Sequence, residues 1–329
     1  MELVKKVNNG GILSYDEAYQ LFEKMVTNEL SEAQIASILI SMKNRKETSQ
    51  EIAAAANVLM KKMVKFEHNF KNTIDTCGTG GDGKSTINIS TAVAINLASM
   101  GYTVIKHGNV AQSGKVGSAD ILDLLHIPCR LEKTDAEKYF IDNRFVFLFA
   151  PFYHPILKNV AKIRKEIMTS TIFNFLGPLM NPGNPDYQII GISKREMLKT
   201  YTDAALMLGK KNIVIYSSDD GFDEISTSDI TKAYIIENGK IDYFFVDPAE
   251  FFKPFPLPVV EDKEEAVNLF MEGIKGENDE ITKIFALNTA VALFIMDKID
   301  IKEHYLKAYD NIKSGNAYRK IQQLRGENE

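Results

Sequence analysis

The first 65 residues place hydrophobic side chains at the spacing of α-helices. Between Ile35 and Met42, apolar residues recur every three or four positions and so fall on one helical face. Ser or Thr residues followed three positions later by Glu or Gln mark helix starts, because the two side chains satisfy amides that a helix leaves unpaired. These capping pairs are Ser14 with Glu17, Ser31 with Gln34, and Thr48 with Glu51. The pattern predicts a small N-terminal helical domain over residues 1–68, whose apolar face either meets a second copy of the chain or packs on the rest of it.

From residue 69 the pattern changes to short apolar runs that alternate with helix-like segments. Predicted strands cover 73–76, 102–106, 145–149, 187–192 and 212–217, and predicted helices cover 92–99, 119–125 and 154–166. Strands that alternate with helices are typical of a parallel sheet covered by helices. We therefore expect residues 69–329 to form a larger α/β domain with a mainly parallel central sheet flanked by helices.

The C-terminal part of the chain adds a hairpin and more helices. Asn238-Gly239 separates two strand-like runs, 231–237 and 240–246. Both turn residues tolerate positive φ, so this segment predicts a β-hairpin. From Glu261 the pattern is mostly helical, and residues 284–293 are apolar enough to belong to the core.

A glycine-rich loop follows the first predicted strand. Gly78, Gly80, Gly81 and Gly83 lie within one short stretch, where backbone N–H groups stay uncovered and suit a phosphate next to a helix N-terminus. The stretch matches neither of the two common nucleotide-binding patterns, and Asp82 inside it would repel a pyrophosphate unless a metal ion or a hydroxyl stands between them. A tight turn without a ligand is the alternative. A second loop of small residues follows the next strand, so both loops can border one pocket.

Composition narrows the class of protein. The chain has 329 residues, 45% hydrophobic and 25% charged, as in ordinary globular proteins, and its net charge of −5 argues against a nonspecific nucleic-acid partner. Only Cys77 and Cys129 are present, which favours a reducing compartment. The opening MELVKKVNNGG has no apolar signal region, and no stretch approaches the length of a membrane span. These features predict a cytoplasmic protein without a membrane partner.

Seven motifs occur in the order found in one enzyme family. They are GTGGDG at 78–83, Thr86 followed by NIST at 88–91, KHGN at 106–109, GSAD at 117–120, Arg164-x-Glu166, TIFNFLGPLMNP at 171–182, and DGFDEIS at 220–226. The chain thereby resembles the anthranilate phosphoribosyltransferases over nearly its whole length. The resemblance implies transfer of a phosphoribosyl group from phosphoribosyl pyrophosphate to the amine of anthranilate in tryptophan biosynthesis, with two Mg²⁺ per active site. It also implies a homodimer formed through the helical domain, to which residues 155–182 return.

The same resemblance assigns residues to the substrates. The donor would be bound by Gly78, Gly81, Asp82, Thr86, Asn88, Ile89, Ser90, Thr91, Lys106, His107, Gly108, Asn109, Ser113, Gly114 and Ser118. Anthranilate would lie between Gly78, Asn109 and Arg164, whose guanidinium can hold a carboxylate through two parallel hydrogen bonds. Magnesium would be held by Ser90, Asp223 and Glu224, since adjacent carboxylates are ligands that Mg²⁺ takes together with phosphates. No residue is assigned as acid or base.

Each of these assignments has a plainer alternative. Asp223 and Glu224 could be a solvated acidic turn, Arg164 part of an exposed charge run, Lys106 a surface lysine, and His107 a structural residue.

The sequence departs from the family at five positions. Val110 and Ser170 stand where the family usually has Arg, Gln112 and Gly114 replace small or hydroxyl residues, and His126 replaces a glycine. Loss of the cation at 110 predicts weaker donor binding or a different acceptor. Two alternatives therefore stay open, a relative that uses another aromatic amine and a noncatalytic protein that binds nucleotides or nucleic acid.

Overall fold

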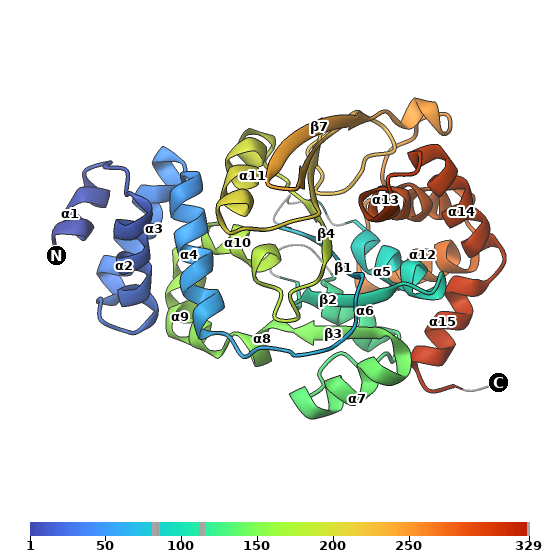
Figure 1. The fold of residues 1–329 in the computed structure, drawn as a ribbon, viewed down its shortest axis with the longest axis horizontal. Coiled ribbons are helices and arrows are strands. Elements are labelled where there is room, and N and C mark those ends of the chain that lie inside the picture. The colour runs from blue at the N-terminus through green and yellow to red at the C-terminus, as the bar shows by residue number, and fades with distance from the viewer. Residues whose placement is uncertain (81–83, 85, 112–115, 328–329) are drawn as a thin grey trace.

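The computed structural model describes residues 1–80, 84, 86–111 and 116–327. Figure 1 shows a helical bundle at the N-terminal end, a central sheet, and a layer of C-terminal helices at the opposite end. The predicted fold class, a small helical domain plus a larger α/β domain, is confirmed. No helix in the described ranges has the length and apolar character needed to cross a bilayer.

Capping residues start the helices of the N-terminal bundle. All three predicted capping boxes are formed, with the hydroxyl and the Glu or Gln side chain each bonded to the other's backbone amide. The apolar face between Ile35 and Met42 is buried inside the bundle, so it is not left over for a partner. The helices are α1 Glu2–Asn8, α2 Tyr15–Val26, α3 Glu32–Arg45 and α4 Ser49–Lys62.

The described residues form a seven-stranded sheet of order β3-β2-β1-β4-β5-β6-β7. The strands β1 to β5 pair in parallel, whereas β6 and β7 form the predicted antiparallel hairpin, with positive φ at Asn238 and Gly239. The strands are β1 Thr73–Gly78, β2 Thr103–Gly108, β3 Phe145–Phe149, β4 Tyr187–Gly191, β5 Ile213–Ser218, β6 Thr231–Glu237 and β7 Lys240–Val246.

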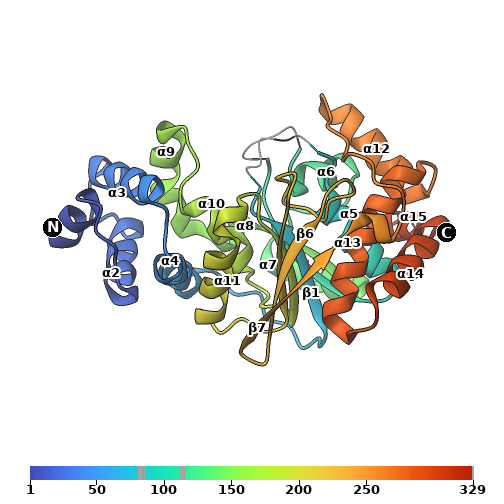
Figure 2. The same ribbon diagram turned by 90° about the horizontal axis from the view of Figure 1, so that it is seen from above.

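Alternate side chains of the sheet enter two different cores. Val214 and Tyr216 of β5 pack with the C-terminal helices, whereas Ile213 and Ile215 pack with α11 and the bundle. Figure 2 shows the sheet between these two groups of helices. The predicted core segment 284–293 is buried in α13. The helices that share a core with Val214 and Tyr216 are α5 Ile89–Ser99, α6 Ser118–Leu124, α12 Lys263–Lys275, α13 Asp279–Asp297, α14 Ile301–Lys313 and α15 Asn316–Leu324.

The chain between β3 and β4 crosses to the bundle and back. In this return segment α9 packs against α2 and α3, and α10 packs against α4. Its helices are α8 Ala150–Tyr153, α9 Lys158–Ile167 and α10 Phe173–Leu176. Two further helices were not predicted, α7 Lys133–Asn143 before β3 and α11 Leu198–Met207 after β4. The return segment lies beside the carboxyl ends of the parallel strands, where parallel sheets bind ligands.

Candidate active site

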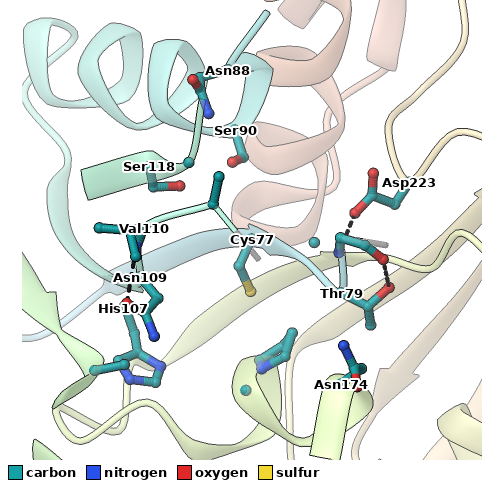
Figure 3. A pocket seen from close by; sticks show the side chains of 18 of the residues that line it. Cys77, Thr79, Asn88, Ser90, His107, Asn109, Val110, Ser118, Asn174 and Asp223 are labelled. Carbon is teal, nitrogen blue, oxygen red and sulfur yellow. Dashed lines mark hydrogen bonds between the residues drawn. The ribbon is translucent and has the colours of Figure 1, made fainter. Parts of the chain in front are cut away.

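A cavity of about 300 Å³ opens between the carboxyl ends of the strands and the return segment. Figure 3 shows Asp223 and Thr79 on one side of it, His107, Asn109 and Val110 on another, and Ser90 and Asn88 at the start of α5. Most of the described residues predicted to bind substrates or metal line this cavity. They are Gly78, Thr86, Asn88, Ser90, His107, Gly108, Asn109, Ser118, Arg164, Asp223 and Glu224.

The glycine loop packs directly against the acidic loop that follows β5. The Gly80 N–H donates to Asp223 Oδ2 at 2.7 Å, and Gly80 has a positive φ of 62°. A side chain at Gly78 would place its Cβ 2.3 Å from the same carboxylate oxygen. A Cβ at 78 would therefore displace the Asp223 carboxylate from its contact with the glycine loop. Gly81 and Asp82 lie outside the described residues.

The start of α5 supplies polar groups to the cavity wall. Asn88 donates to the Val116 carbonyl at 3.1 Å, and its own Oδ1 is buried with no hydrogen-bond partner in the described part of the chain. An oxygen in that position suits a donor group of a ligand. Ile89 and Thr91 do not line the cavity, since Ile89 belongs to the core and Thr91 is fully buried.

The second loop is closed at its base by Asp120. Asp120 Oδ2 accepts from the N–H groups of Ala111 at 2.9 Å and Gly117 at 2.8 Å. Partial burial raises the pKa of Asp120, but these N–H groups outweigh it and the pKa is lowered. The carboxylate therefore stays charged and fixes the two ends of the loop, of which Gln112, Ser113 and Gly114 lie outside the described residues.

Lys106 lies beneath the cavity and does not line it. The side chain is 1% exposed, and its ammonium donates to the Thr76 carbonyl and, at 3.1 Å, to Ser90 Oγ. Burial lowers its pKa, and the nearby Asp75 opposes that shift. In this structure Lys106 supports Ser90, and its predicted contact with phosphate stays a prediction.

Two carboxylates and one hydroxyl offer oxygen ligands to a metal ion. Asp223, Glu224 and Ser90 line the same cavity. Within the described ranges, no group of three or more His, Cys, Asp or Glu residues is placed to hold a metal ion. This set fits Mg²⁺, which keeps waters and binds through one or two carboxylates plus substrate phosphates.

The opposite wall comes from side chains of the return segment. The Arg164 guanidinium is 5.2 Å from the ring centre of Phe173, and burial lowers its pKa. In α9, Lys162 forms ion pairs with Glu32 and Glu166. Among the described residues, no carboxylate lies within 4.0 Å of the Arg164 guanidinium. Arg164 is therefore a partly desolvated cation facing the cavity, which argues against an exposed charge run.

Two buried histidines stand beside this wall. The rings of His107 and His154 are 5.1 Å apart, and burial holds the pKa of His154 at about 4 and that of His107 well below its usual range. Both rings are consequently neutral at pH 7 and present an uncharged surface to the cavity.

Sequence reasoning had not assigned several lining residues of the return segment, although some belong to the TIFNFLGPLMNP motif. They are Ala150, His154, Leu157, Phe173, Asn174, Gly177, Pro178 and Met180.

Comparison with known proteins first defines a class. Residues 1–63 match the glycosyl transferase family, helical bundle domain, and residues 70–318 match the glycosyl transferase family, a/b domain. The two matches correspond to the bundle and to the sheet with its helices.

Individual relatives narrow this class. The chain is 36% identical to the anthranilate phosphoribosyltransferase of Ignicoccus hospitalis, covering 98% of this chain and 96% of the relative. It is 37% identical to that of Dictyoglomus turgidum, covering 99% of this chain and 98% of the relative. The chain belongs to the anthranilate phosphoribosyltransferase family.

Solved structures have the same fold. The crystal structure of the Thermus thermophilus enzyme matches with a TM-score of 0.90 and 30% identity over 99% of both chains. The Saccharomyces cerevisiae enzyme in complex with PRPP and Mg matches with a TM-score of 0.87 and 26% identity over 99% of this chain and 96% of that one.

Proposed function

We propose that this chain transfers the phosphoribosyl group of phosphoribosyl pyrophosphate to the amine of anthranilate, giving N-(5-phosphoribosyl)anthranilate and pyrophosphate. One observation carries the proposal. One cavity has the start of α5 and two adjacent carboxylates at one end, and a desolvated guanidinium next to neutral or apolar side chains at the other. The first end suits a phosphorylated sugar with metal, and the second suits an aromatic carboxylate.

At the donor end the protein binds phosphoribosyl pyrophosphate and orients it for the reaction. Displacement of pyrophosphate from the sugar C1 passes through an oxocarbenium-like state and needs no protein nucleophile, so positioning and electrostatics supply most of the acceleration. We assign the ribose and phosphates to Gly78, Asn88, Asn109 and Ser118, all of which line the cavity. The buried Asn88 Oδ1 accepts a hydrogen bond from a donor hydroxyl.

Ser90, Asp223 and Glu224 are the residues that would hold Mg²⁺, in our proposal two ions per site. Bound magnesium would neutralise charge on the departing pyrophosphate. The Asp223 carboxylate also accepts a hydrogen bond from the Gly80 N–H, so the position of this carboxylate fixes the position of the glycine loop with or without metal.

At the acceptor end Arg164 holds the anthranilate carboxylate. Its two parallel N–H groups discriminate an acid from a plain aniline. His107 and His154, both neutral, leave the aromatic ring in an uncharged environment. The amine then points to the sugar C1 between Gly78 and Asn109, which both line the cavity.

We further propose a cytoplasmic homodimer in which residues 1–68 and 155–182 form the helical domain and the remainder forms the donor-binding domain. Met1 and Ile12 are exposed apolar side chains of the bundle and would lie in the dimer contact. Light scattering of the purified chain tests this arrangement, and a monomer at micromolar concentration would refute it.

The reaction is tested by following the loss of anthranilate fluorescence after addition of phosphoribosyl pyrophosphate and Mg²⁺. Asp223→Asn keeps the shape of the side chain and removes its charge, so we expect at least a roughly thousandfold loss of turnover. A wild-type protein that binds the donor and leaves anthranilate unchanged would refute the acceptor. Substituted aminobenzoates would then be tried as the alternative.

A further inference from the structure

The loop after β4 carries a lysine whose ammonium reaches the return segment. Lys194 Nζ lies 3.5 Å from Ser170 Oγ and 5.4 Å from the ring centre of Phe175. Ser170 precedes α10, and Phe175 lies within it. One cation from the loop after the central strand β4 therefore contacts both the residue before this short helix and one of the aromatic rings of the helix.

The charge of Lys194 also affects Glu47, a buried carboxylate of the bundle. Glu47, in the turn between α3 and α4, is 7% exposed, and its Oε1 has no hydrogen-bond partner in the described chain. Burial raises the pKa of Glu47, and the charge of Lys194 opposes that rise. Lys194 thus lies close enough to the bundle to favour the charged form of a buried carboxylate.

The helix that Lys194 contacts also supports Arg164. The Arg164 guanidinium stacks on Phe173, which shares α10 with Phe175. The buried Tyr201 hydroxyl of α11 donates to the Phe175 carbonyl at 2.8 Å. Figure 1 shows α10 between α4 and the sheet, and α4, α11 and the loop after β4 all contact it. A shift of α10 would carry Phe173 with it and change where Arg164 points.

We propose that Lys194 is a positioning residue for the acceptor: by holding Ser170 and Phe175 against the end of β4, it fixes α10 and thereby the direction of the Arg164 guanidinium. This inference rests on the proposed function of Arg164.

The tether uses the short side chain of Ser170. The Lys194 ammonium lies within hydrogen-bond distance of its Oγ. An arginine at 170 would place a guanidinium in the same space, next to the same ring. In this chain a cation from a different element therefore fills that position.

Steady-state kinetics of Lys194→Gln test the proposal. We expect the KM for anthranilate to rise roughly five- to tenfold, because the contacts of the Lys194 ammonium with Ser170 and Phe175 are lost. The kcat and the KM for phosphoribosyl pyrophosphate should stay within about twofold. Lys194→Arg keeps the charge and should keep the wild-type KM. Lys199→Gln, which removes an exposed lysine of the following helix, is the matched control and should also keep it.

Rescue separates positioning from general damage. Adding Ser170→Arg to Lys194→Gln should return the KM for anthranilate to within about twofold of wild type. The proposal is wrong if Lys194→Gln leaves that KM unchanged, if both substrates are affected equally, or if Ser170→Arg brings no recovery.

Hydrogen exchange tests the tether without turnover. In Lys194→Gln, amides of residues 168–176 should exchange faster than in wild type, while those of β5 should not change. Unchanged exchange at 168–176 would overturn the tether. If exchange is faster but the wild-type protein does not convert anthranilate, the proposed function and the role of Lys194 toward the acceptor are both refuted. The contact of Lys194 with the return segment would still be supported.

Discussion

The two walls of the cavity are built in different ways. The donor wall consists of loops at the ends of β1, β2 and β5, where backbone amides and close glycine contacts determine the geometry. The acceptor wall consists of side chains on α9 and α10, which pack against the bundle. The loop wall tolerates little added volume at its close glycine contacts, whereas the helical wall depends on the charge and direction of a few side chains. Substitutions in the two walls should therefore fail in different ways.

After Asp223→Asn, the largest effect is expected for Gly191→Ala at the end of β4. Its Cβ would lie 1.7 Å from the Asp223 backbone oxygen, so the acidic loop must move. We expect about 3 kcal/mol of destabilisation, and roughly 100-fold slower turnover because a displacement of about 1 Å misplaces catalytic groups. Urea unfolding and the fluorescence assay measure the two quantities.

Gly177→Ala in the acceptor wall is the matched control for that steric argument. A Cβ at Gly177 meets no other atom within 4 Å, and its backbone is helical. Its free energy of unfolding should change by less than about 1 kcal/mol. Equal destabilisation of the two variants would contradict the difference between the walls.

The next largest effect is expected for Arg164→Lys. Lysine keeps the charge but loses the two parallel hydrogen bonds to a carboxylate, a loss of about 1.5–3 kcal/mol. The KM for anthranilate should rise roughly 10- to 100-fold, with the donor KM unchanged. Kinetics with each substrate varied in turn measure this. A rise in the donor KM alone would show that Arg164 binds the phosphoribosyl donor and not anthranilate.

Acid should weaken the acceptor wall through its buried histidines. The pKa of His154 is about 4 in the folded protein and about 6.5 when unfolded, so between these values the unfolded chain binds more protons. The free energy of unfolding should therefore fall as pH decreases from about 6.5 to 4, by about 2–3 kcal/mol from this residue. Denaturant unfolding across this pH range tests the sign. His154→Gln should show a smaller fall, and an identical slope in both proteins would exclude His154 as the cause.

The donor wall was easier to predict from sequence than the acceptor wall. Gly78 was identified because glycines after a strand are a local signal, and the adjacent acids at Asp223 are a weaker local signal that the family motif made specific; both residues line the cavity. The burial of Lys106 beneath the cavity was not predicted. The sequence places this residue on a strand but does not show which groups its side chain contacts.

For the acceptor wall, Arg164 was found only through a family motif. Its neighbours His154 and Phe173 were missed, since their approach depends on how the return segment crosses to the bundle. The helices α7 and α11 were missed as well. The sequence of α7, KTDAEKYFIDN, is mostly polar and buries few residues, so it has little hydrophobic periodicity to reveal it.

The smallest effect is expected for Val110→Arg in the donor wall. Val110 lines the cavity beside Asn109, and its side chain is partly buried against the core. Its N–H donates to Asn109 Oδ1 at 2.8 Å, a backbone contact that a longer side chain leaves in place. A cation at this partly exposed position should contribute about 1 kcal/mol to binding of the phosphates, which lowers the donor KM roughly fivefold. The KM for anthranilate should not change. Val110→Met adds length without charge and is the control that should leave the donor KM unaltered. If Val110→Arg also left it unaltered, the missing cation at 110 would not be a lost phosphate contact, and the loop amides would bind the donor without it.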